Sequence, residues 1–167
     1  MSNKPIRIFV GFDSAEAIAY HVCCQSILEK ASRPVSFTPV GLINVPAEYK
    51  RPRGEKDSTE FAISRFLVPW MCDFQGQALF IDCDMLFRGD VAELFDSGSA
   101  DKSVFVVKHD YIPKSDKKFL GQEQTKYIKK NWSSVMLFNN DRCRALSLDY
   151  VQNAPGLELH QFKWLDD

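Results

Sequence analysis

Two aspartates spaced two residues apart are the side chains of this chain best suited to chemistry. Asp82 and Asp84 follow directly on the uninterrupted apolar residues 79–81. A short apolar run without alternation predicts a buried parallel strand, and residues i and i+2 of an extended chain point the same way. Carboxylate oxygens suit hard divalent cations such as Mg²⁺ or Mn²⁺, which keep positions for phosphate oxygens. The sequence therefore predicts a metal site at a strand end.

The same pair has a second, structural interpretation. Aspartate is common in turns, so Asp82 and Asp84 could simply cap the turn after the strand. The apolar strand before them favours the metal site, because open α/β sheets collect ligands beyond the carboxyl ends of their strands. A cation bound there would stabilise the negative charge that grows on a departing phosphate.

The elements that must position this pair alternate between strands and helices. Apolar or alternating segments predict strands at residues 6–11, 34–42, 77–81, 103–109, 132–139 and 157–162. Helical spacing predicts helices that begin at residues 13 and 58, and others at 91–95 and 141–151. Pro39 indicates that the second strand is an edge strand. This order predicts a single α/β domain whose largely parallel sheet is covered on both faces.

The first helix has the clearest pattern. Its expected buried face consists of residues at intervals of three and four: Ala15, Ile18, Ala19, Val22, Cys23, Ser26 and Ile27. Asp13 and Glu16 have the spacing of a capping box at its start. Free backbone N–H groups at such a start suit nucleotide atoms.

Composition limits the classes of protein. A chain of 167 residues with 45% hydrophobic residues predicts one domain with a substantial core. Lysine and arginine number 21 against 22 acidic residues, so no overall field favours nucleic acid. No apolar run predicts a signal peptide or a transmembrane segment, and we expect a cytoplasmic protein. Five scattered cysteines predict reduced core thiols.

Several well-known catalytic motifs do not occur in the sequence. Glycine-rich dinucleotide and phosphate-loop patterns are missing, as are Gly-x-Ser-x-Gly and His-Glu-x-x-His. His21, His109 and His160 are too widely spaced to favour a histidine-based metal cluster. The loop at residues 46–57 carries four cations, which indicate either a solvated surface or contact with phosphate or acceptor: Lys50, Arg51, Arg53 and Lys56.

Four segments together resemble glycosyltransferase family 8, and they occur in that family's order. They are residues 8–13, 64–66, 80–84 and 135–139, within a resemblance that extends from Ile6 to about Leu165. The resemblance implies a GT-A fold, which is Rossmann-like, with a mostly parallel sheet and helices on both faces. It also implies a hexosyltransferase that moves a hexose from a UDP-sugar to an acceptor hydroxyl with retention.

The resemblance assigns a role to each matching residue. Asp82 and Asp84 match the aspartates that hold the metal, Mn²⁺ or Mg²⁺, against the diphosphate, and Asp82 also approaches the ribose. Arg65 matches the basic residue that reaches the donor sugar and diphosphate. The loop that receives uracil and ribose is represented by Phe12, Asp13 and Ser14.

The chain also departs from the family. Where many members have an asparagine before the last buried strand, this chain has Trp132 followed by two serines. The family's Asp-Gln pair is represented by His160 and Gln161, which makes Gln161 the candidate catalytic residue beside the anomeric carbon. Members continue to a further segment with a metal-binding histidine, so we expect a nucleotide-sugar-binding domain, residues 1–167, that lacks its carboxyl-terminal part. Either His160 or His109 would then replace that ligand, or donor binding would be weak.

Two other functions are compatible with the motif. In a phosphatase of the haloacid dehalogenase type, Asp82 would be the nucleophile and Asp166 and Asp167 the acidic metal pair, but Leu86 stands where that family has threonine or valine. The second of these functions is that of a non-catalytic, truncated nucleotide-sugar-binding domain. The sequence predicts neither the donor sugar, nor the acceptor, nor the oligomeric state. Residues 102–130 are the expected acceptor surface.

Overall fold

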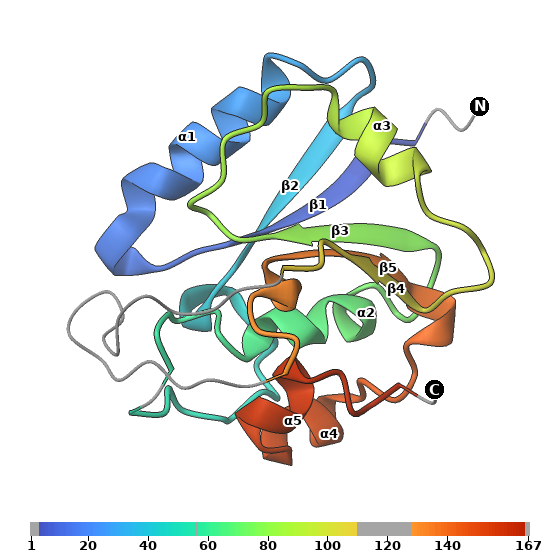
Figure 1. Cartoon of the computed structure of the whole chain (residues 1–167). Coiled ribbons are helices and arrows are strands. Elements are labelled where there is room, and N and C mark those ends of the chain that lie inside the picture. The colour runs from blue at the N-terminus through green and yellow to red at the C-terminus, as the bar shows by residue number, and fades with distance from the viewer. Residues whose placement is uncertain (1–3, 56, 110–127, 166–167) are drawn as a thin grey trace.

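A computed structural model describes residues 4–55, 57–109 and 128–165, and a five-stranded sheet forms its centre (Figure 1). The strands are β1 (Ile6–Gly11), β2 (Val35–Val40), β3 (Gln77–Ile81), β4 (Val104–Val106) and β5 (Val135–Asn139). Their order across the sheet is β2-β1-β3-β5-β4. β1 pairs in parallel with β2 and β3, whereas β5 runs antiparallel to both of its neighbours. The expected mostly parallel sheet is therefore confirmed.

Helices cover both faces of this sheet, as expected. They are α1 (Ala17–Leu28), α2 (Val68–Met71), α3 (Val91–Asp96), α4 (Leu148–Asn153) and α5 (Gly156–His160). Figure 1 shows α1 and α3 on one side of the sheet and α2, α4 and α5 on the other. Within the described ranges, no helix has the length and apolar character needed to cross a membrane.

The central place of β3 in the sheet explains why residues 78–81 are all apolar. Ala78, Leu79, Phe80 and Ile81 are all fully buried, because β3 lies between two strands and under helices on both sides. Burying one such large side chain contributes about 1.5 to 3 kcal/mol. This strand ends at Ile81, so Asp82 lies at the carboxyl end of the central strand.

The first helix differs from its predicted form. Asp13 caps a short 3₁₀ turn (Ser14–Glu16), and α1 begins only at Ala17. Ile18 is 80% exposed, although its spacing placed it on the buried face. At the α-helical rotation per residue, it lies about 140° around the axis from the fully buried Cys23. Val22 is also half exposed, so the prediction was wrong for both residues.

The carboxyl-terminal third contains the clearest errors. Residues 157–162 form helix α5 and the turn after it instead of a strand, because Leu159 and Phe162 bury their side chains at a helical interval. The helix expected at 141–151 is a 3₁₀ turn (Asn140–Arg142) followed by α4, which Ser147 caps.

Two further segments also differ from the prediction. The helical region expected from residue 58 starts as a 3₁₀ helix at Ser64–Leu67, and β4 is a short, half-buried edge strand. Most of the expected acceptor surface lies outside the described residues.

Candidate active site

Three segments meet at the edge where β1 and β3 end. Asp13 is the second residue after β1, Asp82 directly follows β3, and Ser134 directly precedes β5. The amide of Asp82 donates to the carbonyl oxygen of Ser134 at 2.9 Å. β5 runs antiparallel to β3, so its first residues lie beside the last residues of β3. These three segments therefore lie at the same end of the sheet.

Arg65 forms a short ion pair with Asp82 at this end of the sheet. Its Nη1 lies 2.7 Å from Oδ1 of Asp82, and only 7% of the Arg65 side chain is exposed. The guanidinium group stacks over the rings of Phe61 and Phe80, each centroid 5.1 Å from Cζ. Nη1 also donates to the carbonyl oxygen of Ser133 at 2.9 Å. Arg65 is thus a fixed, buried cation that holds one oxygen of Asp82.

The environment of Asp82 works against its ionisation. The pKa of Asp82 is raised from 3.8 to about 6, chiefly by burial and to a smaller extent by the neighbouring Asp84 charge. The Arg65 guanidinium opposes this rise, because an opposite charge favours the ionised form. A carboxylate of this kind gains from a nearby divalent cation, which competes with the proton.

Asp84 lies exposed in the turn after β3, where a ligand can reach it. Two carboxylates plus phosphate oxygens and waters match the way in which Mg²⁺ is usually bound, and they suit Mn²⁺ as well. Within the part of the chain that the structure describes, no group of three histidine, cysteine or acidic side chains could hold a metal ion. The pair therefore fits a cation that shares its coordination with substrate and water.

Glu16 is a neighbour of this pair that the sequence did not single out as a site residue. Burial raises its pKa, a hydrogen bond from Cys83 lowers it, and the charges of Asp84 and Asp13 raise it. The carboxylates of Asp13 and Asp84 therefore lie close enough to Glu16 for their charges to act on it. The sequence did not indicate this proximity, because the capping-box spacing of Asp13 and Glu16 suggested a purely local role for Glu16.

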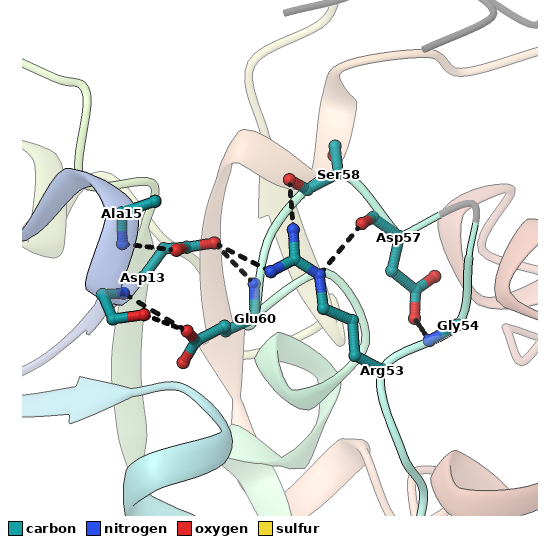
Figure 2. A network of polar contacts seen from close by, with 8 residues as sticks. Asp13, Ala15, Arg53, Gly54, Asp57, Ser58 and Glu60 are labelled. Carbon is teal, nitrogen blue, oxygen red and sulfur yellow. Dashed lines mark hydrogen bonds and ion pairs between the residues drawn. The ribbon is translucent and has the colours of Figure 1, made fainter. Parts of the chain in front are cut away.

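The loop after β1 is held by its own carboxylate. Asp13 is 3% exposed, and its two oxygens accept hydrogen bonds from the amides of Ala15 and Glu60, both at 2.9 Å. Figure 2 shows this network, in which Nη1 of Arg53 lies 3.8 Å from Oδ2 of Asp13. Ser14 donates from its hydroxyl to Glu60 at 2.5 Å. Asp13 thus shapes the loop from inside.

Phe12 lies half buried at the start of the same loop. Its ring packs edge-on against Tyr20 of α1, with the centroids 5.5 Å apart. Its amide donates to the carbonyl oxygen of Val40 at 2.7 Å, which ties the loop to the end of β2. Phe12 is therefore fixed from two sides.

The arginines of the 46–57 loop bind the protein itself. Arg51 donates to the carbonyl oxygens at the end of α4, with 2.6 Å to that of Ala154 and 3.1 Å to that of Val151. Arg53 donates to the carbonyl oxygens of Asp57 and Ser58 at 3.3 and 3.0 Å. Both arginines therefore stabilise the loop, and Lys56 lies outside the described residues.

The carboxyl-terminal helix reaches the site through His160. Nδ1 of His160 lies 2.8 Å from Oγ of Ser133, and its ring meets Phe66 edge-on with centroids 5.2 Å apart. Gln161 follows at the end of α5 and is half buried. The structure thus joins Arg65, Asp82, Ser133 and His160 in one network, and it places Gln161 next to its last member.

Comparisons with known proteins agree with this architecture. No protein-family model matches the chain, so membership of glycosyltransferase family 8 stays a prediction. The chain is 44% identical over 169 residues to Protein CDI of Arabidopsis thaliana, a match that covers 99% of this chain but only 65% of that protein. The structure of the WbbM bifunctional glycosyltransferase aligns with a TM-score of 0.60 at 13% identity, over 98% of this chain and 38% of that chain. The fold is that of a GT-A glycosyltransferase.

Two further solved glycosyltransferases align less closely. The apo form of GlyE from Streptococcus pneumoniae TIGR4 gives a TM-score of 0.49 at 15% identity, over 98% of this chain and 41% of that chain. Mouse xyloside xylosyltransferase 1 gives a TM-score of 0.47 at 16% identity, over 89% of this chain and 74% of that chain.

Proposed function

We propose that this GT-A domain binds a UDP-sugar through a divalent cation and transfers the hexose to an acceptor hydroxyl with retention. The observation that supports this most is the largely buried Arg65–Asp82 ion pair at the carboxyl end of β3, the kind of position where open α/β sheets bind ligands. A buried charge pair of this kind costs desolvation energy, and hydrophobic residues of similar size often give equal stability. Its position beside an exposed second carboxylate, Asp84, favours a role in binding.

Asp82 and Asp84 would hold Mn²⁺ or Mg²⁺ against the diphosphate. When bound, the cation supplies Lewis acidity that stabilises negative charge on the leaving phosphate oxygen. Arg65 fixes Oδ1 of Asp82 and adds a permanent positive charge on the same side of the site. The Arg65 guanidinium and the Asp82 carboxylate hold each other before the substrate arrives. Such preorganised charge is effective in a site shielded from water.

The loop of Phe12, Asp13 and Ser14 would receive the nucleoside. The half-buried ring of Phe12 offers a surface on which uracil can stack. Asp13 keeps the loop in shape through its two amide contacts. Ser14 then lies at the start of the 3₁₀ turn, where the ribose would pass toward Asp82.

The transfer itself needs no protein nucleophile in this proposal. The leaving phosphate oxygen accepts the proton of the acceptor hydroxyl as the new glycosidic bond forms on the same face of the sugar. Gln161 would contact the sugar near the anomeric carbon. The phosphatase alternative loses support, because the fold is that of glycosyltransferases.

Calorimetry of UDP binding tests the proposal without requiring an acceptor. Wild-type protein should bind UDP in the presence of Mn²⁺ or Mg²⁺ and lose most of that affinity in EDTA. Asp84→Asn should bind UDP equally weakly with and without metal. Asp96→Asn is the matched control, because Asp96 is exposed and pairs with Arg33 on the surface. Equal affinity of the wild type with and without metal would overturn the proposal.

A further inference from the structure

A continuous line of contacts joins helix α5 to the proposed metal-binding carboxylate. It runs from Oδ1 of Asp82 to Nη1 of Arg65 at 2.7 Å, and from Nη1 to the carbonyl oxygen of Ser133 at 2.9 Å. It continues from Oγ of Ser133 to Nδ1 of His160 at 2.8 Å. Each contact is of hydrogen-bonding length.

Ser133 is the residue at which this line changes direction. It is 4% exposed and lies in a 3₁₀ turn (Trp132–Ser134) just before β5. Its main chain faces Arg65, whereas its hydroxyl faces His160. The carbonyl oxygen of the next residue, Ser134, accepts a hydrogen bond from the amide of Asp82. The turn therefore contacts both members of the ion pair.

His160 is held on two sides. Its ring packs edge-on against Phe66, which is fully buried directly after Arg65 in the sequence. Its Nδ1 meets the serine hydroxyl. A shift of α5 would accordingly be transmitted to the turn by the hydrogen bond and to the Arg65 segment by the ring contact. Residues that directly orient a metal ligand, as Arg65 would orient Asp82, commonly change metal affinity or activity by about 10- to 100-fold when they are removed.

We propose that Ser133 and His160 are positioning residues that fix the Arg65–Asp82 pair for recognition of a metal-bound nucleoside diphosphate. This inference rests on the proposed function. It adds that the donor site depends on α5, and that a hydrogen bond, not only packing, carries the dependence. Gln161, the next residue, would be placed by the same bond.

Four substitutions separate the hydrogen bond from packing. Ser133→Ala removes the hydroxyl but keeps the carbonyl oxygen that Arg65 binds. His160→Phe keeps a ring against Phe66 but removes Nδ1. His160→Asn keeps a polar atom near the position of Nδ1, and it should restore the bond. His21→Asn is the control, because His21 is an exposed residue of α1 far along the chain from this turn.

The readout is the affinity for UDP with Mn²⁺, together with the melting temperature. We expect Ser133→Ala and His160→Phe each to weaken binding by about tenfold. The double variant should bind no more weakly than either single variant, since both changes remove the same bond. His160→Asn should bind within about twofold of wild type, as should His21→Asn. Unchanged affinity in both single variants, or losses that multiply in the double variant, would overturn the inference.

Amide hydrogen exchange keeps this test separate from that of the proposed function. If wild-type protein fails to bind UDP with metal, the proposed function fails, and positioning can still be read at the amide of Asp82. That amide donates to Ser134 and should exchange faster in His160→Phe, but not in His160→Asn. Equal exchange in all variants would contradict a positioning role.

Discussion

Replacing Arg65 by methionine should expose the energetic cost of the carboxylate that the arginine holds. Methionine keeps an unbranched, apolar side chain against the rings of Phe61 and Phe80. It leaves Asp82 buried beside Asp84 with no counter-charge from Arg65. Breaking a buried ion pair by removing one partner typically costs about 3 to 5 kcal/mol. We therefore expect a loss of that size in the free energy of unfolding of metal-free protein near pH 8.

The loss should depend on pH in a definite direction. Burial raises the pKa of Asp82 in the folded protein to about 6, above the ordinary value of 3.8. A raised pKa means that the folded state binds the proton more tightly, so the contribution of Asp82 to stability is complete below 3.8 and is lost as the pH rises through about 6. In Arg65→Met this pKa rises further. The variant should consequently recover part of its stability at about pH 5.

Urea denaturation in EDTA, followed by tryptophan fluorescence, measures the effect. Arg33→Met is the matched control, because Arg33 forms a 2.8 Å ion pair with Asp96 whose two side chains are 26% and 63% exposed. Surface pairs contribute about 0 to 1 kcal/mol, so that variant should stay close to wild type. If Arg65→Met does not fold near pH 8, adding Asp82→Asn should restore folding, since the unpaired charge is then gone. A loss that equals the control, or one that is the same at both pH values, would refute this reasoning.

Two further predictions concern the frame of the site. A Cβ at Gly41 would lie 2.3 Å from the carbonyl oxygen of Phe12, so Gly41→Ala should lower the free energy of unfolding by about 1 to 3 kcal/mol, whereas Gly89→Ala, with no atom within 4 Å, should be tolerated. Equal urea midpoints for the two variants would contradict the close approach of the loop to the end of β2. Burial raises the pKa values of the Cys23 and Cys143 thiols to about 12, so both should react with Ellman's reagent only after unfolding. Rapid modification of either thiol in native protein would contradict their place in the core.

The strand β3 and the two aspartates that follow it could be predicted because their signals are local. The apolar run of β3 and the two following aspartates lie within a few residues, although the extended backbone ends at Ile81 and Asp84 lies in a turn. The position of β2 at the sheet edge could be predicted for the same reason, since Pro39 removes a donor from the backbone. Such features depend on neighbours in sequence.

Features that depend on distant contacts could not be predicted. Nothing near Arg65 in the sequence indicates that the ring of Phe80 packs against its guanidinium group, because Phe80 comes from another element. Asp13 has a cap-like spacing, but its second oxygen binds the amide of Glu60, 47 positions away. The segment at 157–162 alternates like a strand, and only its packing decides for a helix. Tertiary contacts settle each of these cases.

The location of bound Mn²⁺ tests the central claim most directly. Anomalous X-ray scattering from crystals of the protein with Mn²⁺ and UDP would give the position of the ion without reference to activity. The account predicts one strong peak between the carboxylates of Asp82 and Asp84 and the diphosphate, and no such peak in Asp84→Asn. Bound UDP with no manganese peak at this pair would contradict it.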